Sequence, residues 1–216
     1  MAEKKLEGAG LRGQVAGKTS LSTVGKAGKG LTYRGYEIEV LAEKATFEEV
    51  AYMLLYGNLP NKEEYSSYTD KLKKLRALPN ELKGVLENIP ASAHPMDVMR
   101  TGCSMLGNLE PEGDFKNQNS SADRILASLA SIIVYWYKFS HEGKKVNLET
   151  DFETIGGHFL SLLTDKDPSE DDTRCLDTSL ILYAEHGFNA STFTARTCAS
   201  TLSDTVSYTH LTLPTN

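Results

Sequence analysis

The chain has 216 residues and a formal net charge of −6, with 40% hydrophobic and 24% charged residues. This composition is typical of a globular protein with a substantial core, and its acidic balance argues against nucleic acid or an anionic membrane as the main partner. Its apolar runs are too short to cross a bilayer and residues 1–10 lack the apolar centre of a secretion signal, so we expect a cytoplasmic protein.

Residues 1–38 are rich in glycine, serine and threonine, and apolar residues alternate within 21–24 and 31–38. This pattern predicts a short hairpin or a pair of strands. A GxGxxG pattern at residues 8–13 has no strand before it and no amphipathic helix after it, as a dinucleotide site would require. The segment GQVAGKT is one residue short of a phosphate-binding loop. Both patterns are therefore interpreted as flexible turns.

From residue 46 onward, apolar residues recur at helical spacing, which predicts a mainly α protein. Residues able to cap a helix precede the apolar runs. The predicted helix starts are Thr46, Asn61, Pro95 with His94 before it, Ser120 and Ser169. The helix that starts at Ser120 has a wide apolar face, which predicts packing on more than one side. In the next helix, Gly156 and Gly157 indicate a close approach to a neighbouring helix, because glycine is otherwise costly there.

Three widely separated cysteines, Cys103, Cys175 and Cys198, lie within these helical patterns. Their odd number, and the absence of any metal-ligand spacing, predict buried free thiols in a reducing compartment. We therefore expect no metal site in this chain.

The last predicted helix pair meets in residues 180–196, LILYAEHGFNASTFTAR, where polar residues gather. Tyr183 is predicted to lie on the inward face of the first helix, together with Leu176 and Leu180. Gly187 is expected to end that helix, because glycine takes the left-handed conformation without steric cost.

This placement puts His186 in the last turn of the first helix and makes Asn189 the N-cap of the second. A cationic imidazole is favoured at a helix C-terminus, and free N–H groups at the next N-terminus favour an anion. A ligand that carries a carboxylate would fit between them. The alternative is structural: His186 as a solvated residue at a helix end and Asn189 as a cap only.

Six stretches together resemble the citrate synthase superfamily, and most closely its 2-methylcitrate synthase branch. They are LTYRGYEIEVLAE, FEEVAYMLLYGNLP, ASAHPMDVMRTGCSMLG, ADRILASLASIIVYWYKFSHEG, ETDFETIGGHFLSLL and LYAEHGFNASTFTAR. They follow the family order and spacing over residues from about 15 to 204. The resemblance implies a large helical domain with a small N-terminal β element over residues 1–38 and a partial helical domain over 39–204. It also implies a homodimer, with the family's small domain missing from the chain.

The resemblance also implies roles for three residues. His186 is similar to the histidine that binds oxaloacetate in this family, and Asn189 to a nearby asparagine of the same pocket. Tyr183 is similar to a residue linked to accepting propionyl-CoA in place of acetyl-CoA. Arg34 and His94 lie in family motifs and are interpreted as structural. The implied substrates are oxaloacetate and propionyl-CoA, or acetyl-CoA if the enzyme is a citrate synthase, with no cofactor.

The family reaction is a condensation in which an aspartate removes a proton beside the thioester and two histidines stabilise the reacting oxygens. The resemblance places these catalytic residues beyond residue 204, and residues 205–216 match no family helix. We therefore expect an inactive N-terminal fragment with a foreign tail. The alternative from another functional class is a non-catalytic helical fragment that dimerises.

Overall fold

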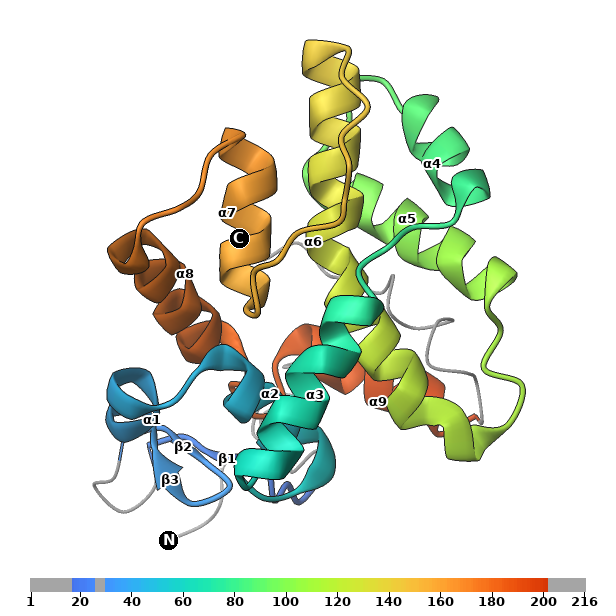
Figure 1. Cartoon of the computed structure of the whole chain (residues 1–216). Helices are drawn as coiled ribbons and strands as arrows, with labels where there is room; N and C mark the ends of the chain where they lie inside the picture. The colour runs from blue at the N-terminus through green and yellow to red at the C-terminus, as the bar shows by residue number, and fades with distance from the viewer. Residues whose placement is uncertain (1–16, 26–29, 202–216) are drawn as a thin grey trace, which may run out of the picture.

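The computed structural model describes residues 17–25 and 30–201. A small antiparallel sheet is followed by helices, so the mainly α prediction is confirmed (Figure 1). The strands are β1 (Ser22–Thr23), β2 (Thr32–Tyr33) and β3 (Tyr36–Glu37). The helices are α1 (Ile38–Lys44), α2 (Phe47–Tyr56), α3 (Lys62–Lys74), α4 (Asn80–Glu87), α5 (Pro95–Leu109), the 3₁₀ turn η1 (Phe115–Asn117), α6 (Gln118–Glu142), α7 (Ile155–Thr164), α8 (Glu170–Tyr183) and α9 (Ala190–Ala199). The GxGxxG pattern and the predicted tail from residue 205 lie outside the described residues.

The N-terminal β element has three strands, one more than the predicted pair. Tyr33 of β2 pairs with Ser22 on one side and with Tyr36 on the other. The β2–β3 turn places Arg34 and Gly35 at positive φ, 48° and 94°, which lets the chain reverse within two residues. Helix α1 follows β3 directly and was not predicted.

Helix α6 is the central element, as its wide apolar face predicted (Figure 1). It contacts α3, α4, α5 and α7. Ala127 belongs to the core formed with the sheet, α1, α2, α3 and α8. Ile132 and Trp136, further along the same helix, belong to a second core formed with α4, α5 and α7. One helix therefore joins two hydrophobic clusters, and its Ala127 and Ile132 are fully buried.

Most predicted helix starts are confirmed by cap geometry. Thr46 and Asn61 form complete capping boxes, and the Nδ1 atom of His94 accepts a hydrogen bond from the backbone N–H of Met96. Ser169 also caps its helix as predicted. The predicted start at Ser120 is wrong, because α6 begins at Gln118 as a continuation of η1.

Gly102 of α5 marks the closest approach between α5 and α6. A Cβ atom at this position would stand 2.5 Å from Cγ2 of the buried Ile132. The Gly102→Ala substitution is therefore expected to lower the free energy of unfolding by about 1–3 kcal/mol. Gly84→Ala in α4 is the matched control, because nothing lies within 4 Å of its added Cβ, and it should stabilise the chain by about 0.5–1 kcal/mol. Urea unfolding of both variants checks this, and equal shifts would contradict it.

Candidate functional site at the turn between α8 and α9

Helix α8 ends earlier than predicted. Its last residue is Tyr183 and Ala184 is the C-cap, so His186 lies beyond the helix and not in its last turn. The buried hydroxyl of Tyr33 causes this ending. It lies 3.1 Å from the carbonyl oxygen of Ile181 and accepts the backbone N–H of Glu185 at 3.2 Å. In a continuing helix that N–H would donate to Ile181, so the inserted hydroxyl interrupts the helical hydrogen bonds.

The turn after α8 is held by the carboxylate of Glu185. Its Oε1 atom accepts a hydrogen bond from the hydroxyl of Ser22 at 3.3 Å and another from the backbone N–H of Gly187. Gly187 has φ +76°, and its Cα faces Ser22 and Val24 of the N-terminal segment. The predicted left-handed glycine is therefore present, but it shapes the connection and does not end the helix directly.

Asn189 is the N-cap of α9, as predicted. Its side chain accepts the backbone N–H of Thr192, with 2.8 Å between Oδ1 and N. Its Nδ2 donors have no hydrogen bond to a described residue, and the side chain is exposed. The exposed imidazole of His186 likewise has no hydrogen-bond partner among the residues that the structure describes. At two nearby positions the turn therefore presents polar groups that donate to no other described residue.

Tyr183 does not lie on the inward face of α8, and that prediction is wrong. Its side chain is 93% exposed. The inward positions are Asp177 and Ile181, which are four residues apart and therefore one above the other on the helix, and both are buried. Tyr183 follows two residues after Ile181, which turns its side chain towards the opposite side. Tyr183 and His186 are both exposed, one at the last residue of α8 and the other three residues later.

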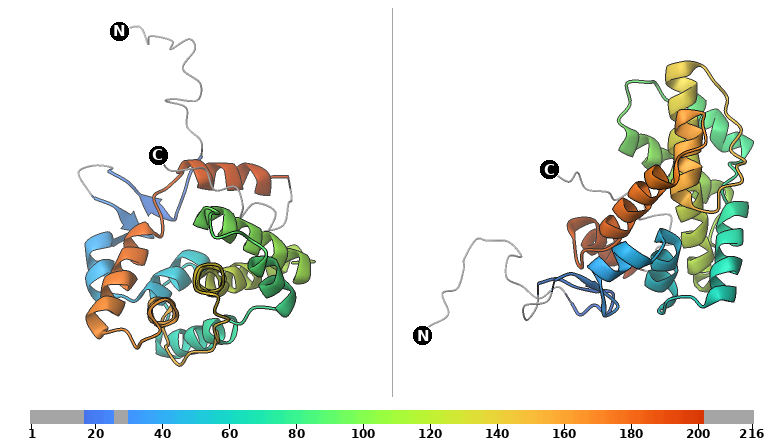
Figure 2. Two further views of the ribbon diagram at one scale, coloured as in Figure 1. Left: turned by 90° about the horizontal axis from the view of Figure 1, so that it is seen from above. Right: turned by 60° about the vertical axis from the view of Figure 1, so that its left-hand side comes forward.

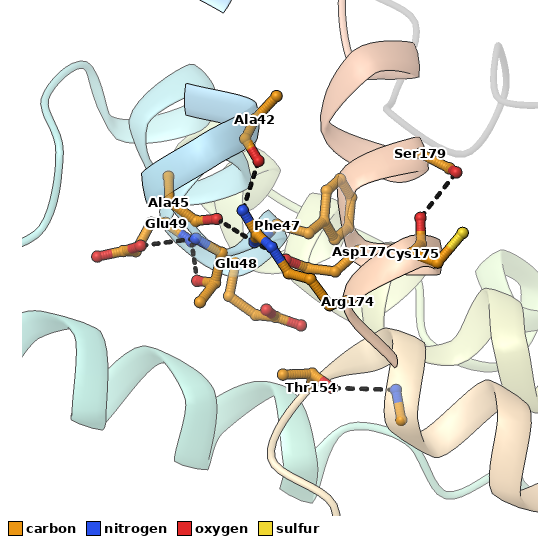
Figure 3. A network of polar contacts seen from close by, with 12 residues as sticks. Ala42, Ala45, Phe47, Glu48, Glu49, Thr154, Arg174, Cys175, Asp177 and Ser179 are labelled. Atoms are coloured by element: carbon orange, nitrogen blue, oxygen red, sulfur yellow. Dashed lines mark hydrogen bonds and ion pairs between the residues drawn. The ribbon is translucent and has the colours of Figure 1, made fainter. Parts of the chain in front are cut away.

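A partly buried polar network connects α8 to α1 and α2 (Figure 3). The guanidinium of Arg174 donates to the carbonyl oxygens of Ala42 and Ala45, and the Oδ1 atom of Asp177 accepts the N–H of Phe47 at 2.9 Å. Burial raises the pKa of Asp177 above its ordinary value. The network joins the first half and the middle of α8 to the end of α1 and the start of α2.

Glu48 lies beside this network and is fully buried. Its Oε1 atom accepts the backbone N–H of Ile155 at 2.7 Å, at the start of α7. Burial raises the pKa of Glu48 to about 7, and the hydrogen bond from Ile155 opposes that rise. Glu48 thus connects α2 to α7, while Asp177 connects α2 to α8.

The close approach predicted from Gly156 and Gly157 is confirmed at Gly156. A Cβ atom there would lie 3.6 Å from the carbonyl oxygen of Thr173 and 3.7 Å from the N atom of Asp177, both in α8. Gly157 serves a different contact, since its Cβ would meet Phe152 and the capping hydroxyl of Thr154 in its own loop.

The turn can offer hydrogen-bond donors to an anionic ligand. An imidazolium and a side-chain amide both match carboxylate oxygens. Among the described residues no group of histidine, cysteine and acidic side chains could hold a metal ion. Within that same part of the chain, no helix is both long and apolar enough to span a bilayer.

Sequence reasoning missed Tyr33 and gave Glu185 no separate role. Alternation in residues 31–38 did indicate a strand at Tyr33, and both residues of β2 are buried. However, its hydroxyl is bonded to the carbonyl oxygens of Ile181 and Leu182, which are 148 and 149 positions later in the chain. A contact over that distance in sequence cannot be predicted from a local pattern. Arg34 and His94, interpreted as structural, do make structural contacts: Arg34 donates to the carbonyl oxygen of Leu54 and His94 caps α5.

Comparison with known proteins gives a consistent family match. The family described as "Citrate synthase, C-terminal domain" matches residues 10–210. The 2-methylcitrate synthase of Shewanella oneidensis is 66% identical over 201 residues, which cover 93% of this chain and 54% of that protein. The 2-methylcitrate synthase 1 of Corynebacterium glutamicum is 37% identical, with coverage of 92% and 54%.

Solved structures agree in fold. The citrate synthase of Thermotoga maritima matches with a TM-score of 0.80 and 32% identity, over 94% of this chain and 54% of that one. The citrate synthase of Pyrobaculum aerophilum matches with a TM-score of 0.82 and 32% identity, over 94% and 53%. The chain therefore spans about half the length of the relatives it matches.

Proposed function

This chain belongs to the citrate synthase family, and on that premise we propose that it is part of a 2-methylcitrate synthase and carries one wall of its oxaloacetate site. The complete enzyme would condense propionyl-CoA with oxaloacetate and water to 2-methylcitrate and CoA. The observation that carries this proposal is the 66% identity to the Shewanella oneidensis enzyme over 93% of this chain.

His186 and Asn189 are the proposed contacts to oxaloacetate. Both are exposed at one turn, and their uncommitted donors match the carboxylates and the keto oxygen of that substrate. Tyr183 is the proposed contact on the acyl-CoA side, because it is exposed at the last residue of α8, three residues before His186. The aspartate and histidines that perform the chemistry are proposed to lie outside this chain, so the chain alone is expected to be inactive.

Citrate synthase activity with acetyl-CoA is the second candidate. It is favoured by the citrate synthase of Deinococcus radiodurans, which is 36% identical over 90% of this chain. A homodimer in the cytoplasm is part of the proposal in either case. The three cysteines are free thiols, which supports a reducing compartment, but the predicted burial is right only for Cys103, since Cys175 is exposed and Cys198 is half-buried. A non-catalytic dimerising protein is the remaining alternative.

The test compares the complete enzyme with a His186→Ala variant. Release of CoA thiol is measured with oxaloacetate and either propionyl-CoA or acetyl-CoA. The loss of one charge-assisted contact predicts that kcat/KM for oxaloacetate falls about 10–100-fold. His141→Ala, an exposed histidine near the end of α6, is the matched control and should behave like the parent. A parent without condensing activity would refute the proposal, and a preference for acetyl-CoA would favour the second candidate.

A further inference from the structure

The turn that carries His186 is tied to a part of the chain that is distant in sequence. Tyr33 is fully buried, and its hydroxyl meets the carbonyl oxygens of Ile181 and Leu182 as well as the N–H of Glu185. The first two are carbonyls of the last turn of α8, where the regular helical hydrogen bonds stop, and the Ile181 carbonyl also accepts the N–H of the C-cap Ala184 at 3.2 Å. One side chain from β2 therefore fixes where α8 stops and where the turn begins.

Glu185 forms a second connection between the turn and the same sheet. Its carboxylate accepts hydrogen bonds from Ser22 of β1 and from the backbone N–H of Gly187, so it bridges both sides of His186. Ser22 pairs with Tyr33 across the sheet. These contacts thus come from two neighbouring strands of one sheet, which lies beside the α8–α9 turn (Figure 2).

His186 has no hydrogen bond of its own to a described residue that would set its position. Its place depends on the backbone on either side, which Tyr33 and Glu185 hold. We propose that Tyr33 and Glu185 are positioning residues for oxaloacetate, acting through the turn on His186 and Asn189 and not by touching the substrate. This inference rests on the proposed oxaloacetate role of His186.

The chain offers a matched pair of tyrosines for the test. Tyr33→Phe removes the buried hydroxyl and keeps the ring. Tyr36→Phe, in the next strand, removes an exposed hydroxyl that has no hydrogen bond to a described residue. In the complete enzyme, Tyr33→Phe should raise the KM for oxaloacetate about fivefold, as expected for one or two lost hydrogen bonds. The kcat and the KM for the acyl-CoA should change less than twofold, and Tyr36→Phe should match the parent.

A second measurement uses the 216-residue chain itself and needs no activity. Amide hydrogen exchange at Glu185 should accelerate about tenfold in Tyr33→Phe, because that N–H loses its acceptor. In the same way, Glu185→Ala should accelerate exchange at Gly187 and raise the KM for oxaloacetate. Glu185→Gln should restore both, because its amide oxygen can still accept the two hydrogen bonds.

Each outcome decides between the two proposals. If the parent enzyme has no affinity for oxaloacetate, the proposed function fails, and unchanged exchange in Tyr33→Phe would also overturn the positioning role. If the parent binds oxaloacetate and Tyr33→Phe keeps the parental KM, only the positioning role is overturned. If Tyr33→Phe does not fold, the Glu185→Ala and Glu185→Gln pair decides by the same criteria. A fall in kcat as large as the rise in the KM for oxaloacetate would indicate a merely structural role and overturn the proposal. A similar rise in the KM for the acyl-CoA would do the same.

Discussion

Arg76→Met is expected to lower the free energy of unfolding by about 3–5 kcal/mol, because it breaks a buried charged network by removing one partner. Arg76 is only 2% exposed. Its guanidinium donates to the carbonyl oxygens of Phe152 and Glu153 at 2.5 and 2.7 Å. Methionine fills similar space, but it leaves both carbonyl groups unpaired and Glu48 without its nearby positive charge. Urea unfolding at pH 7 measures the loss.

Arg100→Met is the matched control for this prediction. Arg100 forms an ion pair with Asp97 at 2.8 Å, but its side chain is 48% exposed. Solvent screens such pairs, so the expected loss is at most about 0.5 kcal/mol. Similar losses in the two variants would show that Arg76 acts as an ordinary surface cation and would contradict the network described here.

The Arg76 network also shows what local sequence patterns can and cannot predict. Thr46, Asn61 and Asn189 were correctly identified as helix caps, because capping depends on residues three positions apart. Arg76 and Glu48 meet Phe152, Glu153 and Ile155 across distant parts of the chain. Nothing in the local sequence around an arginine indicates that it will be buried.

In the candidate site, too, local features could be predicted and contacts between distant parts of the chain could not. The break between two helices and the cap at Asn189 are local features and could be predicted from residues 180–196. The exact end of α8 could not, because the hydroxyl of Tyr33 determines it from the N-terminal sheet. The error for Tyr183 has a related cause. A weakly amphipathic helix such as α8 allows more than one inward face, and buried Asp177 marks the real one although aspartate is polar.

Asp123 illustrates how a correct residue type can lead to a wrong structural role. It lies three residues after Ser120, the predicted helix start, which is where the partner of a capping residue would stand. In the structure it is fully buried and accepts hydrogen bonds from Tyr68 at 3.1 Å and from Lys71 at 2.6 Å. The carboxylate thus joins α6 to α3. Partners from another helix outweighed the local capping preference, and only the tertiary structure reveals them.

The stability of the chain is expected to depend on pH through two buried groups that act in opposite directions. His158 is fully buried between the hydroxyls of Ser131 and Thr150, with Nε2 and Nδ1 at 3.0 and 2.9 Å from them. Burial lowers the pKa of His158 to about 3, and the positive charge of Arg76 contributes. The unfolded chain therefore binds this proton more tightly than the folded chain between about pH 3 and 6.5. In that window His158 makes stability rise with pH.

Glu48 has the opposite effect, because its pKa is raised to about 7 by burial. Two charged side chains also act on Glu48: the negative charge of Asp177 raises its pKa, and the positive charge of Arg76 lowers it. Between about pH 4.5 and 7 the folded chain binds this proton more tightly than the unfolded chain, so Glu48 makes stability fall as pH rises. The two slopes cancel where the windows overlap. The contributions of these two groups alone should therefore sum to a gain in stability up to about pH 4.5, a level range to about pH 6.5, and a slight decline above it.

Two single variants separate these contributions. His158→Gln keeps groups that can bond to both hydroxyls, and it should lose the rise at low pH and decline from about pH 4.5 to 7. Glu48→Gln should instead gain stability continuously from about pH 3 to 6.5, by about 3–5 kcal/mol in total. Urea unfolding at half-unit pH steps distinguishes the three curves. Parallel curves for parent and variants would mean that neither group changes its pKa on folding. In that case water would have to reach the buried Glu48 and His158 in the native chain, because loss of hydration is the main cause of both pKa shifts.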